Sequence, residues 1–271
     1  MQISPEMRKQ GIAHVFTLAS PTYDSVVPFF AHFGRRIVDL AGIRPGDSVL
    51  DVAAGRGAVL LPAAAAAGPS GRVIGVDLAV GMVDSLRERI VDDGLGNADV
   101  RLMDAESLEF GDAEFDVVVC AFGIMFLPNA AEALHGFRRV VKPGGRVAIA
   151  VWAGGAPDFH LGELAVQFGM ANLEGGPPPP WADEASFTAM LDAAGFRDSR
   201  VVTDEATFAY AGVDEWWRTQ MSHGARAYVA FLAEDQRRPF EAAARQRYVE
   251  VTGSKGPSTF VQRALIALAG A

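Results

Sequence analysis

VLDVAAGRGAVLL, residues 49–61, joins a short apolar run to a turn with two glycines and then to a second apolar run. The first run has the pattern of a buried strand, and the second can begin a helix. Glycine permits backbone conformations and close approaches that other residues resist, so a loop of this kind commonly holds a ligand. Residues 49–61 therefore predict a strand, a ligand-binding loop and a helix in succession.

Apolar runs of strand length alternate with helical patterns after this loop. The strands are expected at 49–53, 72–77, 98–104, 115–122 and 146–152, and the helices between them at 58–67, 80–91 and 130–141. Such alternation is typical of a parallel sheet with helices on both faces. We therefore expect an α/β protein with a doubly wound, mostly parallel sheet.

The segments on either side of this core have other patterns. Residues 1–40 are expected to form an amino-terminal helical lid, and residues 41–155 the cofactor-binding core. Residues 156–271 are expected to complete the sheet and to carry two helical substrate-lid insertions, at about 156–183 and 212–256. The apolar end of the chain, residues 259–271, is interpreted as the last strand, with a short helix as the alternative.

The composition is that of an ordinary globular protein. Half of the 271 residues are hydrophobic, and the formal net charge is −9. An acidic chain is repelled by a phosphate backbone, so nucleic acid is not expected as a partner. The single cysteine, Cys120, excludes an internal disulfide and a multi-cysteine metal site, and no metal is expected.

Membrane association and export are not expected either. The longest run of small apolar residues, 58–68, is shorter than the roughly 18 to 20 residues that span a bilayer. The amino terminus is a poor signal peptide, because its charged residues precede only a short apolar stretch. We therefore expect a cytoplasmic protein, and the sequence does not indicate its oligomeric state.

The residues in and before the loop indicate whether it binds a pyrophosphate or a cation. A dinucleotide fingerprint would be G-x-G-x-x-G, but Gly55 and Gly57 are followed by Leu60 where the third glycine belongs. Asp51 precedes the loop, and a carboxylate there would repel a pyrophosphate but suit a cation. S-adenosylmethionine carries a sulfonium and an ammonium and no phosphate, and it is therefore the expected cofactor.

Two further acids end the next two predicted strands. Asp77 can accept hydrogen bonds from both hydroxyls of a ribose. Asp104 can accept one from an adenine amino group, while the Ala105 N–H meets a ring nitrogen. A ribose contact alone would also fit a nicotinamide cofactor, but acids after three successive strands favour the sulfonium cofactor.

Five blocks occur in order within about residues 45–155: VLDVAAGRG, GVDLAVGM, LMDAESL, FDVVVCAFGIMFLPN and RVVKPGGRVAIAVW. Together they resemble the class I S-adenosylmethionine-dependent methyltransferases of small molecules, nearest to the branch that includes the ubiquinone and menaquinone methyltransferases. The resemblance implies a Rossmann-like methyltransferase fold: a doubly wound, mostly parallel seven-stranded sheet with an antiparallel final strand at its edge, and a helical lid.

The resemblance also implies individual cofactor contacts. It places Asp51, Gly55, the Arg56 backbone and Gly57 at the methionine end, Asp77 at the ribose, Leu78 and Met82 over the adenosine, Asp104 and Ala105 at the adenine, and Ala121 and Phe122 beside the methionine moiety. Ala53 departs from the pattern, because the family usually has glycine there. Alanine disfavours positive φ, so a slight shift of the loop is expected, with Ala53 still at the cofactor.

Histidines are the candidates for acid–base chemistry. His160 follows the fifth predicted strand and His223 lies in the second lid insertion, and lids of this family close over the methyl group from these two regions. Tyr23, Trp181 and Trp217 are the candidates for substrate contact. For each of these residues the alternative is a purely structural role at the surface or in the packed interior.

The expected function is methyl transfer from S-adenosylmethionine to oxygen, carbon or nitrogen of a small, largely hydrophobic organic acceptor, in the manner of specialised metabolism. A general base is needed only where the acceptor must lose a proton. Two alternatives stay open: a non-methylating enzyme, such as a cyclase, that keeps the cofactor pocket, and a nicotinamide-dependent oxidoreductase.

Overall fold

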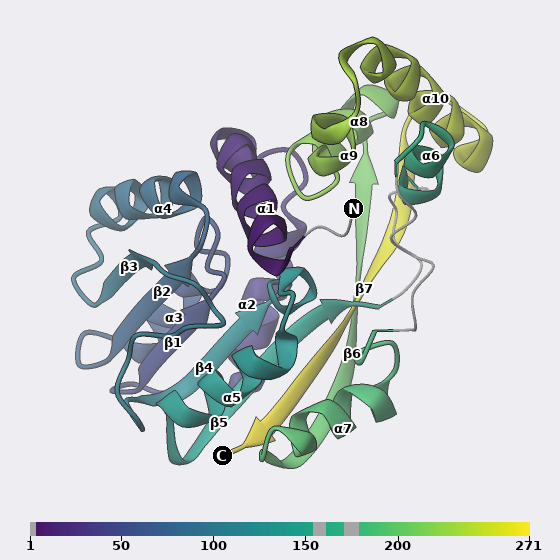
Figure 1. Cartoon of the computed structure of the whole chain (residues 1–271). Helices are drawn as coiled ribbons and strands as arrows, with labels where there is room; N and C mark the ends of the chain where they lie inside the picture. The colour runs from purple at the N-terminus through teal and green to yellow at the C-terminus, as the bar shows by residue number, and fades with distance from the viewer. Residues whose placement is uncertain (1–3, 154–160, 171–178) are drawn as a thin grey trace.

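The strands of the chain assemble into one seven-stranded sheet. The computed structural model describes residues 4–153, 161–170 and 179–271. The strands are β1 (Ser48–Val52), β2 (Arg72–Asp77), β3 (Ala98–Leu102), β4 (Phe115–Ala121), β5 (Val141–Trp152), β6 (Arg197–Tyr210) and β7 (Ser258–Gly270). Their order is β3-β2-β1-β4-β5-β7-β6, and β7 runs antiparallel to both of its neighbours (Figure 1). The predicted fold class and the antiparallel direction of the final strand are thereby confirmed. The predicted position of that strand is wrong, because β7 lies between β5 and β6 and the edge strand is β6.

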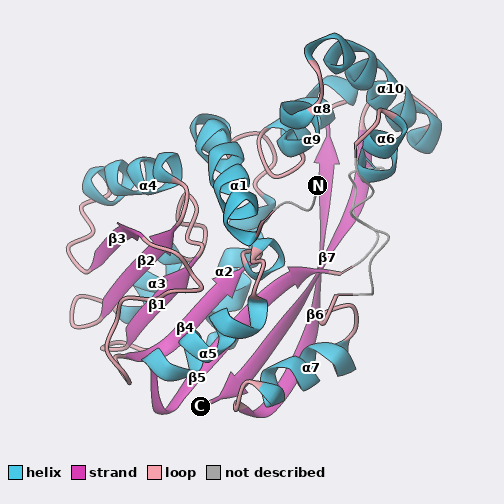
Figure 2. Ribbon diagram, viewed as in Figure 1, coloured by secondary structure: helices cyan, strands magenta, loops and turns pink. Residues whose placement is uncertain are grey.

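Helices cover both faces of the sheet (Figure 2). The helices α2 (Phe29–Ala41), α3 (Leu60–Ala67) and α4 (Val80–Asp92) contribute to one buried cluster, and α5 (Ala130–Val140) and α7 (Glu184–Ala193) to the other. Successive residues of a strand point to opposite faces, and in β4 Val117 and Val119 enter the first cluster whereas Val118 and Cys120 enter the second. The continuous apolar run of β4 follows from this burial on both faces.

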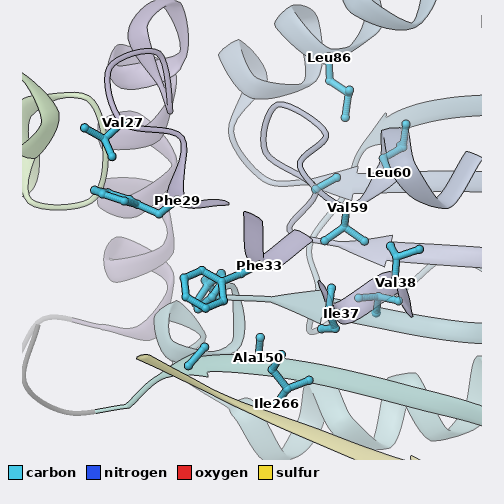
Figure 3. Close-up of a cluster of buried hydrophobic side chains, with 14 of the residues drawn as sticks. Val27, Phe29, Phe33, Ile37, Val38, Val59, Leu60, Leu86, Ala150 and Ile266 are labelled. Atoms are coloured by element: carbon cyan, nitrogen blue, oxygen red, sulfur yellow. The ribbon is translucent and has the colours of Figure 1, made fainter. Parts of the chain in front are cut away.

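The helix α2, within the segment expected to form the amino-terminal lid, packs in the core of the sheet domain, and its first residues Phe29 and Phe30 line the cavity described below. Its residues Phe33 and Ile37 are fully buried, and Figure 3 shows them in the cluster that includes Ala150 and Ile266 of the sheet. Close packing requires Gly34, because a Cβ there would lie 2.0 Å from the Ala58 carbonyl oxygen.

The first helix, α1 (Pro5–Ala19), lies outside the sheet sandwich. Ser4 caps it, because its hydroxyl accepts a hydrogen bond from the Met7 N–H at 3.2 Å. Figure 1 shows α1 between α4 and the helical layer that contains α9 (Arg226–Phe231), and α1 contacts both helices. The short 3₁₀ turn η1 (Ser20–Thr22) then leads toward α2.

The last two strands extend beyond the main sheet and carry further helices. β7 pairs with β5 only from Ala264 onward but with β6 from Ser258, so residues 258–263 form a two-stranded ribbon with β6. The helices α8 (Val213–Met221), α9 and α10 (Glu234–Thr252) connect the ends of this ribbon, and α6 (Leu161–Gln167) packs against α9 and α10 (Figure 1).

Three predicted elements differ from the structure in their details. The helical region after residue 212 is divided into α8, α9 and α10. Residues 142–145, between the predicted helix 130–141 and the predicted strand 146–152, lie inside β5, where the pairing passes from Phe115↔Val141 to Val117↔Arg146. The helix α3 begins at Leu60, which places Pro62 in the first turn, where a missing N–H breaks no helical hydrogen bond.

Within the described ranges, no helix is long and apolar enough to cross a membrane.

Candidate active site

A cavity of about 330 Å³ lies at the carboxyl ends of β1, β2, β3 and β4. Residues at or just after these ends line one side of it: Ala53, Gly55, Asp77, Leu78, Met103, Asp104, Ala105, Ala121 and Phe122. The other side consists of α1, the start of α2 and the turn between α8 and α9. Parallel strands bring loops that are distant in sequence to one edge, and the order reverses between β1 and β4, where such folds bind ligands.

Asp77 holds the glycine loop in place. Its carboxylate accepts hydrogen bonds from the Gly55 N–H at 2.8 Å and from the Ala79 N–H at 2.9 Å. Burial raises the pKa of Asp77, and these two backbone hydrogen bonds counteract part of that rise. The carboxylate is therefore oriented toward the cavity by the backbone and has room for further donors, such as ribose hydroxyls.

Asp51 lies beneath the loop and does not line the cavity. It is 1% exposed, and its Oδ2 has no hydrogen-bond partner among the described residues. Burial and then the nearby Asp77 raise its pKa well above the usual value. Asp77 in the wall and Asp51 beneath the loop are two carboxyl groups whose ionised forms a nearby cation would stabilise, so a cationic ligand fits this end of the cavity.

Two residues beside the cavity have left-handed backbone conformations. Ala53 has φ 58° and Phe122 has φ 59°, a region that residues other than glycine rarely adopt. The Ala53 methyl group fits because Gly123 faces it: a Cβ on Gly123 would lie 2.4 Å from the Ala53 Cβ. The loop thus keeps the conformation expected for glycine at position 53, and the extra methyl is accommodated by a neighbour.

The end of the cavity at Asp104 carries an ion cluster that the sequence analysis did not predict. Lys9 of α1 lies 2.6 Å from Asp104 Oδ2 and 2.6 Å from Glu106 Oε2. Lys9, Ile12, Ala13 and Phe16 all line the cavity, at the spacing of one helix face. That spacing was the available signal, since it shows that Lys9 and the apolar residues share a side of α1.

The opposite half of the cavity is aromatic. It is lined by Phe16, Phe29, Phe30, Phe126, Trp152 and Tyr228. Phe122 stacks on Trp152 with 3.9 Å between ring centroids, and Tyr23 stacks on Phe30 at 5.1 Å. Tyr23 lies over the glycine loop, because a Cβ on Gly55 would be 3.9 Å from its ring. This half can receive a flat, apolar molecule next to the cofactor end.

His223 lines the aromatic half, after the end of α8. Its Nε2 is buried without a hydrogen-bond partner among the described residues, and its ring lies 5.8 Å from that of Phe29. Burial lowers the pKa of His223 to about 4, because the charged imidazolium loses its hydration. At neutral pH the side chain is a neutral imidazole.

Several predicted site residues are not brought to the cavity. Trp217 packs at 6.4 Å from Phe240, with the guanidinium of Arg245 5.9 Å from its ring. Trp181 packs against the cluster of α5 and α7. These two placements do not support substrate contact. His160 lies outside the described residues.

Arg56 and Gly57 also do not line this cavity. Arg56 Nη1 donates to the Tyr23 carbonyl oxygen at 3.1 Å, and both residues border a second cavity behind the loop. They support the glycine turn from outside. Met82, in contrast, is buried and lines the main cavity beside Leu78.

The sheet order, the glycine loop and the carboxylates at successive strand ends together define a class I methyltransferase fold with a cofactor cavity. Residues 49–145 match the family described as methyltransferase domain. The protein YcgJ from Bacillus subtilis, a solved structure, matches with a TM-score of 0.57 at 18% identity, covering 88% of this chain and 98% of that one.

Three relatives are similar in sequence. Aklanonic acid methyltransferase DauC of Streptomyces sp. (strain C5) is 37% identical over 69% of this chain and 87% of its own length. Nocamycin O-methyltransferase of Saccharothrix syringae is 31% identical over 90% and 93%. Ubiquinone/menaquinone biosynthesis C-methyltransferase UbiE of Ectopseudomonas mendocina is 38% identical over 54% and 59%. This chain belongs to the S-adenosylmethionine-dependent methyltransferases of small molecules, which confirms the resemblance and the cofactor.

Proposed function

We propose that this methyltransferase acts on an acidic hydroxyl group, or an equally acidic carbon, of a small, largely hydrophobic ring compound. The observation that carries the proposal is His223, a neutral imidazole in the aromatic half of the cavity whose Nε2 has no hydrogen-bond partner among the described residues. An acceptor that must lose a proton needs such a base, whereas a free amine does not need one at the methyl-transfer step.

The cofactor residues are proposed from the chemistry of the cavity. When bound, S-adenosylmethionine supplies a methyl group on a positively charged sulfur that leaves as a neutral thioether. We propose that Asp77 accepts from the ribose hydroxyls and Asp104 from the adenine amino group, with Leu78 and Met82 against the adenosine. Gly55, Ala53, Ala105, Ala121 and Phe122 provide the rest of the wall, and Asp51 acts from beneath the loop through its charge.

His223 then has a defined part in the reaction. Its Nε2 accepts the hydrogen bond of the acceptor O–H or C–H and takes the proton as the new bond to carbon forms. The positive charge leaves the sulfur and arrives on the imidazole, so the net charge of the cavity is unchanged. Burial makes the imidazole a weak base, which suits proton transfer late in the step, when the reacting oxygen has become strongly acidic.

The names of the relatives support this range of acceptors. One is named an O-methyltransferase and another a C-methyltransferase. Both reactions remove a proton from the acceptor, which is the chemistry that His223 can serve.

The test uses methyl-labelled S-adenosylmethionine with 1-naphthol and 1-naphthylamine as probes. We expect label in the naphthol product, and we expect His223→Leu to lower kcat by about 100-fold or more while the affinity for S-adenosylhomocysteine is unchanged. His135→Leu, an exposed change on α5, is the control. Label in the amine alone, or full activity of the His223 variant, would contradict the proposal; conversion of a probe without label would indicate the non-methylating alternative.

A further inference from the structure

The acceptor half of the cavity contains three polar side chains that each have one buried polar atom without a hydrogen-bond partner among the described residues. Gln220 Oε1, His223 Nε2 and Gln262 Oε1 are buried without a hydrogen-bond partner among the described residues, and all three side chains line the cavity. Gln220 and Gln262 are 2% and 5% exposed. A buried polar atom without a partner costs about 1–3 kcal/mol, so three of them beside one cavity indicate a ligand that completes them.

The fold brings the three side chains to one place from two elements. Gln220 and His223 are three residues apart at the end of α8, on one side of the chain. Gln262 lies on the ribbon part of β7, and Phe260, two residues earlier, shares its face. The Phe29 ring connects both elements, since it lies 5.8 Å from His223 and 6.1 Å from Phe260.

All three unpartnered atoms have the same hydrogen-bonding role, that of an acceptor. The two amide oxygens accept hydrogen bonds, and His223 Nε2 accepts one in the neutral tautomer that carries its proton on Nδ1, which is the tautomer that the proposed base requires. Gln220 has already committed its amide N–H, which donates to Tyr210 Oη at 3.5 Å. The ligand must therefore present donors, namely O–H or N–H groups.

The charged residues that line the cavity indicate the charge of the ligand. Lys9 is the only lysine or arginine among the described lining residues, and it is paired with Asp104 and Glu106 at the adenine end. An anionic ligand would find no free cation in the acceptor half and would meet three acceptor atoms. A neutral ligand with donors meets neither problem.

We propose that Gln220, His223 and Gln262 form a recognition subsite that selects an uncharged aromatic acceptor with at least two hydroxyl groups. One hydroxyl donates to His223 and is the group that reacts, and the second donates to the glutamine oxygens and orients the ring. This inference rests on the proposed function, because it assigns the reacting group to His223. The glutamines are specificity-determining residues in this arrangement.

The test measures binding to the protein saturated with S-adenosylhomocysteine. The probes are 1-methoxynaphthalene, 1-naphthol, 1,3-dihydroxynaphthalene and 1-naphthoate, which differ in donors and charge on one ring system. We expect the diol to bind at least tenfold more tightly than 1-naphthol, and the ether and the carboxylate to bind more weakly than both. In Gln262→Met and Gln220→Met the advantage of the diol should fall to about twofold or less.

The glutamine variants also have a readout apart from ligand binding. In Gln262→Met, methionine keeps the length of the side chain and removes the unpartnered oxygen, so the midpoint of thermal unfolding without acceptor should be unchanged or raised. Gln220→Met also removes the donor to Tyr210 Oη, so this readout applies to Gln262→Met alone. Gln236→Met, an exposed change on α10, is the matched control and should leave the binding order intact. A purely structural glutamine would instead give a lower midpoint with an unchanged preference for the diol.

The outcomes separate this inference from the proposed function. If the diol has no advantage over 1-naphthol, if 1-naphthoate binds best, or if no probe binds at millimolar concentration, the subsite is wrong. If the protein fails to bind S-adenosylhomocysteine, the cofactor site and not the subsite is at fault. If 1-naphthol is methylated at full rate by the His223 variant, the base is wrong while the glutamine preference can still hold.

Discussion

At the scale of single residues, the loop keeps a strained alanine by means of a neighbouring glycine. Ala53 has φ 58°, and Gly123 leaves the space that the Ala53 methyl group occupies. A left-handed conformation costs an alanine about 1 kcal/mol relative to glycine. The two positions are therefore coupled, although they are far apart in the chain.

A double-mutant cycle on this pair tests the coupling. Gly123→Ala should destabilise the protein by about 1–3 kcal/mol, because the two Cβ atoms would be 2.4 Å apart. Ala53→Gly alone should change stability by less than about 1 kcal/mol, since relief of strain is offset by chain entropy. The double variant should recover most of the loss, leaving only the contact of the new Cβ with Cys120 Sγ at 3.1 Å. Urea unfolding of all four proteins measures the cycle, and simple additivity would show that the methyl groups do not compete.

His223 gives a second prediction at this scale, in the dependence of stability on pH. Its folded pKa of about 4 lies below the ordinary value of 6.5, so the unfolded chain binds the proton first as the pH falls. The stability associated with His223 is complete above pH 6.5 and is lost toward pH 4. Between pH 8 and pH 5 the loss is about 2 kcal/mol.

Asp24 contributes a pH dependence of stability with the opposite sign, and the experiment must separate its contribution from that of His223. Burial raises the pKa of Asp24 to about 7, so its contribution grows as the pH falls. The measurement is therefore the difference in unfolding free energy between wild type and His223→Leu at pH 8 and pH 5. The variant should gain about 2 kcal/mol relative to wild type at pH 5. His135→Leu should show no such gain, and an equal difference at both pH values would contradict a buried neutral imidazole.

At the scale of elements, the helix α1 is attached to the sheet domain by Lys9. The lysine is paired with Asp104 and Glu106, whose side chains are 26% and 6% exposed. The same helix face carries the apolar residues that cover the cavity. Closure of the cavity at Asp104 thus depends on one cation and a short apolar stripe.

Lys9→Met should loosen this closure. The side chain keeps its length but leaves two carboxylates without their counter-ion, so we expect amide exchange in α1 to rise about fivefold to tenfold. Release of S-adenosylhomocysteine should accelerate by a similar factor. Arg8→Met is the control, because Arg8 is the exposed neighbour on the same helix. Equal exchange rates in both variants would show that the apolar stripe alone holds α1.

The elements also show what sequence could predict. The strands and the acids after them were predictable because each belongs to a local pattern: an apolar run followed by a polar residue at a sheet edge. The prediction that Trp217 contacts the substrate is not supported, because Trp216 and Trp217 both pack between α8 and α10. Gln220 and Gln262 carry no local signal, since their proximity depends on how the ribbon of β7 folds back toward α8.

At the scale of the whole molecule, the acidic groups of the cofactor cavity destabilise the protein when no ligand is bound. Burial raises the pKa of both Asp51 and Asp77, and the charge of Asp77 raises the pKa of Asp51 further. A folded pKa above the unfolded value means that stability is lost as the pH rises through the folded pKa. A bound cation favours the ionised carboxylates and so offsets this loss of stability. Cofactor binding and global stability are therefore coupled.

Asp77→Asn tests this coupling. Without ligand, the variant should become more stable relative to wild type as the pH rises from 5 to 8, because asparagine cannot ionise. With S-adenosylmethionine at about 100 times the wild-type Kd, wild type should gain about 2.7 kcal/mol and the variant less than about 1 kcal/mol. Asp84→Asn, whose carboxylate is exposed on α4, should behave as wild type in both respects. Thermal unfolding with and without ligand measures both effects, and a full ligand response in Asp77→Asn would mean that the ribose is held elsewhere.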